Sequence, residues 1–418
     1  MPLARRLTLG DAVAIGLGSM VGAGVFAVWA PAIGVAGSGI LVALAIAALV
    51  AYCNATASAQ LAAAHPVAGG TYAYARVEIG PWWGFVAGWS FVIGKIASCA
   101  AMAMTFAAYA APESWRVPVS VAAVAALTVV NCFGITRTAL LTRILVACAL
   151  LGLAVVVAFG LGSTAIASPP PLEEATAYGV LQGAGLLFFA FAGYARIATL
   201  GEEVVDPART IPRAIVLALG GAVAVYALVA VTVIMTLGAD AATSTAPLVD
   251  VLTVSGWPAL APVVRVAAAA ASLGALLALI TGIGRTTLAM ARESDLPRAL
   301  ARIDERWQVP RRAEIAIGVA VIGILLVADL RDAIGFSSFG VLLYYLIANA
   351  AAFRQGAAAR RYPRALQVMG ALGCLLLVNT LPVLASLVGT AVVLIGVLYR
   401  AIRLRIGISP PSSDGRAR

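Results

Sequence analysis

The sequence has very little charge, and this excludes most soluble architectures. Only 11% of its 418 residues are Asp, Glu, Lys or Arg, whereas 62% are hydrophobic. A water-soluble domain of this length needs far more polar surface. Apolar stretches of about 20 residues, long enough to cross a bilayer as a helix, recur along the whole chain. The composition therefore predicts an all-α, polytopic protein whose surroundings are the lipid bilayer.

Histidine and clustered cysteines are also scarce, and this limits the chemistry on offer. The five cysteines lie inside apolar segments without metal-ligand spacing, so we expect them to fill small core positions. The one histidine, His65, stands beside a proline. We therefore expect no metal site, no cofactor and no catalytic centre. The net charge of +10 comes from arginines spread over short connections, so we expect no nucleic-acid partner.

The apolar runs predict twelve transmembrane helices in a single domain, residues 1–404, followed by a short cytoplasmic tail, residues 405–418. The expected spans lie near residues 11–36, 39–64, 83–111, 117–134, 140–162, 178–200, 213–237, 259–286, 313–329, 333–353, 365–385 and 387–404.

The arginines predict the orientation of these spans. Arginine in short connections stays on the cytoplasmic side. With the N-terminus inside, nearly all arginines fall on that side, and Arg116, Arg265 and Arg331 alone fall on the other. We therefore expect a multi-pass protein of the plasma membrane with both termini in the cytoplasm. Lys95 and Arg196 lie within predicted spans.

The first span carries an unusual run of small residues, "GLGSMVGAGVF" at residues 16–26. Each glycine in a helix costs about 1 kcal/mol relative to alanine, so the run needs a reason. A dinucleotide-binding turn is excluded, because no strand, acidic residue or alternating pattern accompanies it. Close packing through Gly18-x-x-x-Gly22 is one alternative. The other is a deliberate interruption of the helix.

A second interruption favours the latter interpretation. The sixth span, "LLFFAFAGYARIATLGEEV", is broken near its middle by Gly193. Two broken helices, each opening one half of the chain, are typical of two five-helix repeats of opposite topology. A break at Gly22 would leave N–H groups free for a carboxylate, and carbonyls freed near residues 190–192 would suit an ammonium group. The pattern predicts a receptor for a zwitterion such as an amino acid.

The chain resembles the amino acid–polyamine–organocation superfamily of permeases along nearly its full length. The resemblance rests on "GLGSMVGAGVF", "HPVAGGTYAYARVEIGPWWGFVAGW", "FFAFAGYARIATLGEEVVDPARTIPRAI" and "GRTTLAMARESDLPRAL". It implies two inverted repeats, about residues 11–162 and 178–353, with two extra helices over about 365–404. Most members of this superfamily move amino acids or related amines, driven by protons or by exchange.

The resemblance also implies roles for individual residues. The segment whose N–H groups hold the substrate carboxylate corresponds to Ser19, Met20, Val21, Gly22, Ala23 and Gly24. The unwound part of the sixth helix, with carbonyls for the amino group, corresponds to Ala190, Phe191 and Ala192, next to Gly193. Phe189 falls where relatives often have an aromatic gate, although ordinary packing is the alternative. Ser272 is expected beside the pocket.

Two positions depart from the superfamily pattern. Where many relatives carry an acid after the glycine of the sixth helix, this chain has Tyr194, Ala195 and Arg196; where some carry a lysine on the fifth helix, it has Ala149. The proton-coupling roles of those side chains therefore do not carry over.

Lys95, the single lysine of the chain, lies near the middle of the third span. An unpaired charge at that depth costs at least about 2.5–3.5 kcal/mol, so it is expected to face the bundle interior. It is a candidate for proton coupling, or for taking the place of a bound cation. A structural or snorkelling lysine is the alternative.

Charge also bears on the substrate and on gating. We expect Arg196 to pair with Glu202 or Glu203, or to line the cytoplasmic path, within a loop that opens during transport. No Asp or Glu is predicted near the midplane, which argues against cationic substrates and favours small or apolar neutral amino acids, with acidic ones as an alternative. The sequence thus predicts a secondary active amino acid transporter, with protons as a candidate coupling partner. The alternative functions are an amino acid sensor or binding-only protein on the same fold, or a permease for acidic amino acids or other amines.

Overall fold

The computed structural model describes residues 7–65, 69–134, 139–163, 171–194, 197 and 204–406. Within these residues the secondary structure is helical apart from one isolated β-bridge between Leu7 and Val204. The helices are α1 (Leu9–Met20), α2 (Gly24–Ala27), α3 (Trp29–Ala36), η1 (Gly37–Gly39), α4 (Ile40–Ala64), α5 (Thr71–Glu78), α6 (Pro81–Ala110), η2 (Glu113–Trp115), α7 (Arg116–Cys132), α8 (Ala139–Leu161), α9 (Ala177–Phe191), η3 (Ala192–Tyr194), α11 (Pro207–Leu237), η4 (Gly238–Ala242), α12 (Pro247–Val254), η5 (Pro258–Leu260), α13 (Ala261–Arg292), η6 (Arg298–Ala301), α14 (Arg311–Val327), α15 (Leu330–Arg354), α16 (Arg364–Thr380) and α17 (Val383–Arg405), where η marks a 3₁₀-helix.

Ten helical segments of the described chain are long and apolar enough to cross a bilayer. Two further helices, α14 and α16, occupy the predicted ninth and eleventh spans but have 17 residues each. At 1.5 Å per residue they extend about 26 Å, slightly less than a hydrocarbon core of about 30 Å. The expectation of a polytopic helical membrane protein is confirmed, and twelve crossings stay a prediction.

Local sequence fixes where several helices begin. Thr8 and Asp11 form a capping box at the start of α1: the Thr8 N–H donates to the Asp11 carboxylate at 3.0 Å, and the Asp11 N–H donates to the Thr8 hydroxyl at 3.3 Å. Side-chain oxygens of Thr176 and Asp329 accept N–H groups in the first turns of α9 and α15. Pro81 opens α6, where its missing N–H costs nothing.

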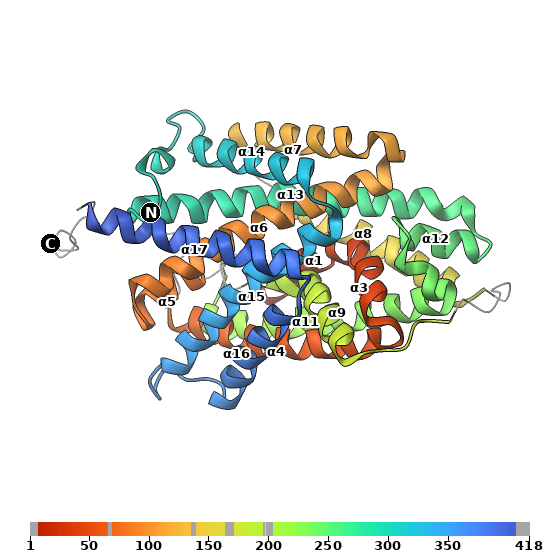
Figure 1. Ribbon diagram of the computed structural model, residues 1–418, viewed down its shortest axis with the longest axis horizontal. Coiled ribbons are helices and arrows are strands. Elements are labelled where there is room, and N and C mark those ends of the chain that lie inside the picture. Colours follow the sequence, from red (N-terminus) through yellow and green to blue (C-terminus); the bar gives the residue numbers. More distant parts are fainter. Residues whose placement is uncertain are drawn as a thin grey trace.

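The helices pack in a pattern that repeats between the two halves of the chain. α6 runs through the middle of the bundle and packs on both α13 and α15 (Figure 1). When α1, α4, α6, α7 and α8 are matched in order with α9, α11, α13, α14 and α15, each contact pair has a counterpart. α1 with α11 corresponds to α9 with α4, and α8 with α13 corresponds to α15 with α6. The pairs α4–α11, α6–α13 and α7–α14 correspond to themselves.

Basic side chains gather at one end of the bundle. In Figure 1 this end, with α5 and the last turns of α17, lies on the left, and α3 and α12 lie on the right. Arg76 on α5 and Arg400 on α17 both bond Asp295, just beyond α13. At the other end of α6, Arg265 donates to the Tyr109 carbonyl at 2.9 Å. This distribution agrees with the predicted sides of Arg76 and Arg265. Four of the five cysteines are buried between helices, as expected of core residues.

Candidate functional site

The first membrane helix is interrupted inside the glycine-rich run. α1 ends at Met20, residues 21–23 form a turn, and α2 starts at Gly24. Residues 20–29 are all buried. Among the described residues, none of the N–H groups of residues 22–25 makes a hydrogen bond of ordinary geometry, and no side chain caps α2. The break therefore leaves a short row of buried main-chain donors without protein acceptors.

The second interruption lies at the end of α9. This helix stops at Phe191 and tightens into η3. At such an end the carbonyl oxygens of the last helical turn lack the N–H donors that a continuing helix would supply. The carbonyls of Ala190, in this turn, and of Ala192, just after it, accept hydrogen bonds from side chains. An acceptor-rich helix end thus faces the donor-rich break of the first helix.

Glycine allows the two breaks to touch. A Cβ atom added to Gly24 would lie 2.8 Å from the Cα atom of Ala190, and one added to Gly193 would lie 2.2 Å from the carbonyl oxygen of Ser19. Both distances are far below van der Waals contact, so any side chain here would push the segments apart. Close helix packing is the alternative role predicted for these glycines. Gly18 has this role, because a Cβ atom added to it would lie 2.1 Å from the Val146 side chain of α8. The run therefore combines interruption with close packing.

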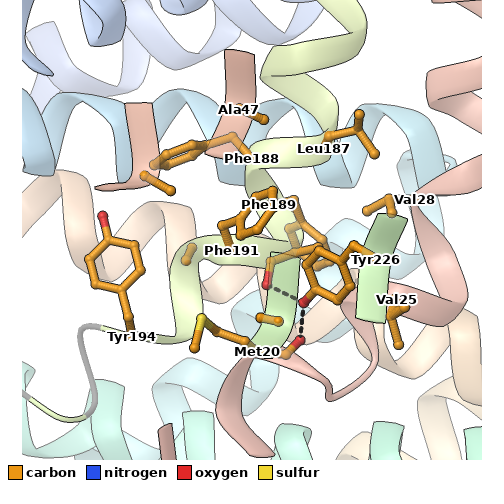
Figure 2. Close-up of a cluster of buried hydrophobic side chains, with 14 of the residues drawn as sticks. Met20, Val25, Val28, Ala47, Leu187, Phe188, Phe189, Phe191, Tyr194 and Tyr226 are labelled. Carbon is orange, nitrogen blue, oxygen red and sulfur yellow. Dashed lines mark hydrogen bonds between the residues drawn. The ribbon is translucent and has the colours of Figure 1, made fainter. Parts of the chain in front are cut away.

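A tyrosine on a third helix ties the breaks together. The hydroxyl of Tyr226, on α11, lies 2.6 Å from the Met20 carbonyl oxygen and 2.9 Å from the Ala190 carbonyl oxygen. Figure 2 shows this hydroxyl between the two segments, with the ring of Phe191 beside it. Its single proton can go to either carbonyl. The last carbonyl of α1 and the penultimate carbonyl of α9 therefore share one donor.

Sequence reasoning missed Tyr226. A tyrosine within an apolar span signals a buried hydrogen bond, because its hydroxyl needs a partner. The partner is 206 residues away along the chain and is a main-chain oxygen, so its identity has no side-chain signature. Tyr345 on α15 has the same kind of role, donating to the Ala192 carbonyl at 3.4 Å.

Three phenylalanines of α9 have different surroundings. Phe188 packs edge-on against Tyr345 with ring centroids 5.9 Å apart, and Phe191 against Tyr226 at 4.9 Å. Both have no exposed surface, whereas Phe189 keeps 7% of its surface exposed. Phe188 and Phe191 therefore act as core residues. Phe189, the predicted gate, is the one of the three with surface left for a further contact.

Lys95 is buried in the middle of α6 and lacks a counter-charge. Its side chain is 7% exposed, and it forms no ion pair or hydrogen bond within the described part of the chain. The neighbouring turns face α15: Gly94 lies against Gly340, and the hydroxyls of Ser98 and Ser337 are 2.6 Å apart. Lys95 therefore makes no bond to the carbonyls of the first helix within the described residues, and its role as a stand-in for a bound cation stays a prediction.

Ser272 lies on α13, one turn before the residue that faces the first break. This residue is Ala275: a Cβ atom added to Gly22 would lie 3.3 Å from the methyl group of Ala275. The Ser272 hydroxyl is fully buried and has no hydrogen-bond partner among the described residues. A buried hydroxyl without a partner is costly, so this group is available to a small polar ligand or water. Arg196, Glu202 and Glu203, the predicted gating residues, lie outside the described residues.

Comparisons with known proteins identify relatives over the whole of this architecture. Residues 11–407 match the family described as amino acid permease. An uncharacterized transporter of Mycobacterium tuberculosis is 55% identical over 405 residues, which cover 96% of this chain and 92% of that protein. Cationic amino acid transporter 6, chloroplastic, of Arabidopsis thaliana is 30% identical over 386 residues, 84% of this chain and 66% of its own length. Cationic amino acid transporter 4 of Homo sapiens is 27% identical over 374 residues, 82% of this chain and 58% of its own length.

The Tyr226 bridge can be tested by removing one oxygen atom. We expect Tyr226→Phe to lower the free energy of unfolding by about 1–2 kcal/mol, because two buried carbonyls lose their shared donor while the ring packing on Phe191 is kept. The control is Tyr178→Phe, since Tyr178 is 51% exposed and its loss should change stability by less than about 0.5 kcal/mol. Unfolding of both purified variants in the same detergent measures the difference. Equal stabilities would contradict the bridge.

Proposed function

Because this chain belongs to the amino acid permease family, we propose that it is a secondary active transporter that moves amino acids across the plasma membrane by alternating access. The observation that carries this proposal is the pair of breaks. Buried donors for which the described residues supply no acceptor lie at residues 22–25, and an acceptor-rich helix end lies directly beside them. A zwitterion has both complementary charges.

Twelve spans with two inverted five-helix repeats and two extra helices are the architecture we propose for this activity. The exchange-symmetric helix contacts support it, since repeats of one ancestral unit pack through equivalent faces. In this architecture the broken helices open equivalent halves and meet near the midplane. The arginine-rich end of the bundle is the one where Arg76 and Arg400 lie, with α5 and the last turns of α17. Because arginines favour the cytoplasmic side, this end supports the proposal that both termini are cytoplasmic.

Substrate binding would use main-chain groups rather than charged side chains. We assign the substrate carboxylate to the N–H groups of residues 22–25 and the ammonium group to the carbonyls of residues 190–192. The carbonyl oxygens of Ala190 and Ala192 each have a second lone pair beyond the one that a tyrosine occupies. Phe189, with its remaining exposed surface, would cover the bound molecule.

Charge and size favour a small or apolar neutral side chain on the substrate. Lys95 supplies a positive charge without a counter-ion among the described residues, and this raises the energy of a second cation nearby. Ala275, which contacts Gly22, and Ser272, one turn earlier on α13, are small. Two relatives are named cationic amino acid transporters, at 27% and 30% identity. The unpaired lysine argues for a different substrate class here, and acidic amino acids are the second candidate because Lys95 could neutralise them.

A counterflow assay tests the function and the substrate class together. The full chain is reconstituted in liposomes that are loaded with one amino acid at a time, and uptake of the same labelled compound is measured. We expect accumulation of alanine-sized or apolar neutral amino acids at least about tenfold above that of arginine or putrescine. Empty liposomes serve as the control. Preferential uptake of arginine would overturn the charge argument, and no counterflow with any amino acid would overturn transport.

Lys95 is our candidate for the coupling residue, because a buried ammonium group without a partner can release its proton to a changing environment. Lys95→Ala is expected to keep counterflow but to lose accumulation driven by a pH gradient. Lys95→Arg tests charge alone, since arginine keeps the cation and does not deprotonate in proteins. It should also lose gradient-driven accumulation. If both variants respond to the pH gradient as the wild type does, Lys95 has no part in coupling.

A further inference from the structure

A second polar site lies far from the helix breaks, where α5, α13 and α17 meet at the arginine-rich end. A cavity of about 280 Å³ opens there between Arg76, Trp82, Asp295, Arg400, Arg403 and Leu404. This volume corresponds to roughly nine water molecules at about 30 Å³ each. The cavity therefore has room for a small polar group.

The acidic wall of this cavity is already neutralised. Asp295, which is 5% exposed, accepts hydrogen bonds from Arg76 at 2.8 Å and from the Tyr72 hydroxyl at 2.9 Å, and it also pairs with Arg400. Burial and this carboxylate raise the pKa of Tyr72, so its hydroxyl stays protonated and keeps donating. The Arg76 Nη1 atom donates to Asp295, and its Nη2 atom forms an ion pair with Glu293 at 3.2 Å. Both carboxylates of the cavity are thus occupied.

Guanidinium donors remain on the same wall. Arg400 is 7% exposed, and its guanidinium lies against the rings of Trp82 and Phe85, so it contributes charge to the cavity. Arg403 donates through Nη1 alone, to the Leu296 carbonyl and the Tyr399 hydroxyl. Three arginines face two carboxylates in this cavity, so it has a net positive charge and unused donors. Such a combination selects an anion that accepts several hydrogen bonds.

The surroundings place this cavity at the depth of lipid headgroups. Trp82 and Trp83, at the start of α6, are 42% and 55% exposed, and tryptophan is typical of the membrane–water interface. The Arg400 guanidinium lies 5.1 Å from the centroid of the Trp82 ring. Leu404 closes the other side, and the outer face of α17 is apolar and exposed. One wall of the cavity therefore suits hydrocarbon and the other suits an anion.

We propose that this cavity binds a phosphate group supplied by the headgroup of an anionic phospholipid. The phosphate accepts hydrogen bonds from Arg403 and is attracted by the positive charge of Arg400, and the glycerol and acyl carbons lie along Trp82 and Leu404. Basic pockets between helices on the cytoplasmic side are suited to such headgroups. The bound lipid joins α17 to α5 and to the end of α13, and so holds the last helix against the transporter core.

Thermal unfolding of the full chain in neutral detergent tests the site. Phosphatidylglycerol is expected to raise the midpoint by about 2 °C or more relative to phosphatidylcholine at the same mole fraction. Arg403→Gln should remove most of this difference. Arg405→Gln is the matched control, because Arg405 lies on the same last turn, is exposed and does not line the cavity. Equal responses of the two variants, or equal midpoints in the two lipids, would overturn the proposal.

The source of the phosphate is tested separately with inorganic phosphate and glycerol 3-phosphate. A rise as large as that with phosphatidylglycerol, removed by Arg403→Gln, would overturn the lipid source. Native mass spectrometry of the wild-type protein requires no variant to fold. From an equimolar mixture it should retain phosphatidylglycerol over phosphatidylcholine, and equal retention of both would overturn the site. None of these readouts depends on transport, so they are independent of the proposed substrate.

Discussion

Main-chain hydrogen bonding inside a bilayer is the constraint on which the rest of this structure depends. Lipid offers no partner for an N–H or C=O group, so an interrupted helix must find other partners for the groups it frees. Here Tyr226 supplies a donor to Met20 and Ala190, and Tyr345 supplies one to Ala192. The donors at residues 22–25 receive no equivalent from the residues that the structure describes. Among the described residues, the freed carbonyls thus accept hydrogen bonds from tyrosines, whereas the freed N–H groups have no acceptor. The proposed recognition of a carboxylate depends on this difference.

Charge is placed under the same constraint. Arginines occupy the ends of the bundle, where they pair with carboxylates or main-chain carbonyls, as Arg400 does with Asp295 and Arg265 with Tyr109. Two buried charged residues form no ion pair within the described residues: Lys95 in the middle of α6 and Glu314 in the first turn of α14. An unpaired charge in the middle of a membrane span is costly, and in our account Lys95 is kept there for a function.

The breaks were predictable from sequence, and the bridges across them were not. Glycines at residues 22, 24 and 193 lower the stability of a helix in otherwise apolar spans and allow two segments to approach closely. α1 ends at Met20 and α9 at Phe191, each within a few residues of these glycines. Tyr226 and Asp295 could not be assigned in this way. The partners of Tyr226 are main-chain oxygens 36 and 206 residues away, and those of Asp295 include arginines 105 and 219 residues away. Such pairs follow from tertiary packing rather than from any local pattern.

The central claim is that the open N–H groups of residues 22–25 bind the carboxylate of the transported amino acid. Hydrogen–deuterium exchange of the peptide covering these residues, with the full chain in lipid nanodiscs, tests this claim most directly. A saturating transported amino acid should slow exchange there by about fivefold or more, since each new hydrogen bond contributes about 1 kcal/mol. The corresponding amine without a carboxylate should have no effect. Unchanged exchange with an amino acid that is demonstrably transported would contradict the account.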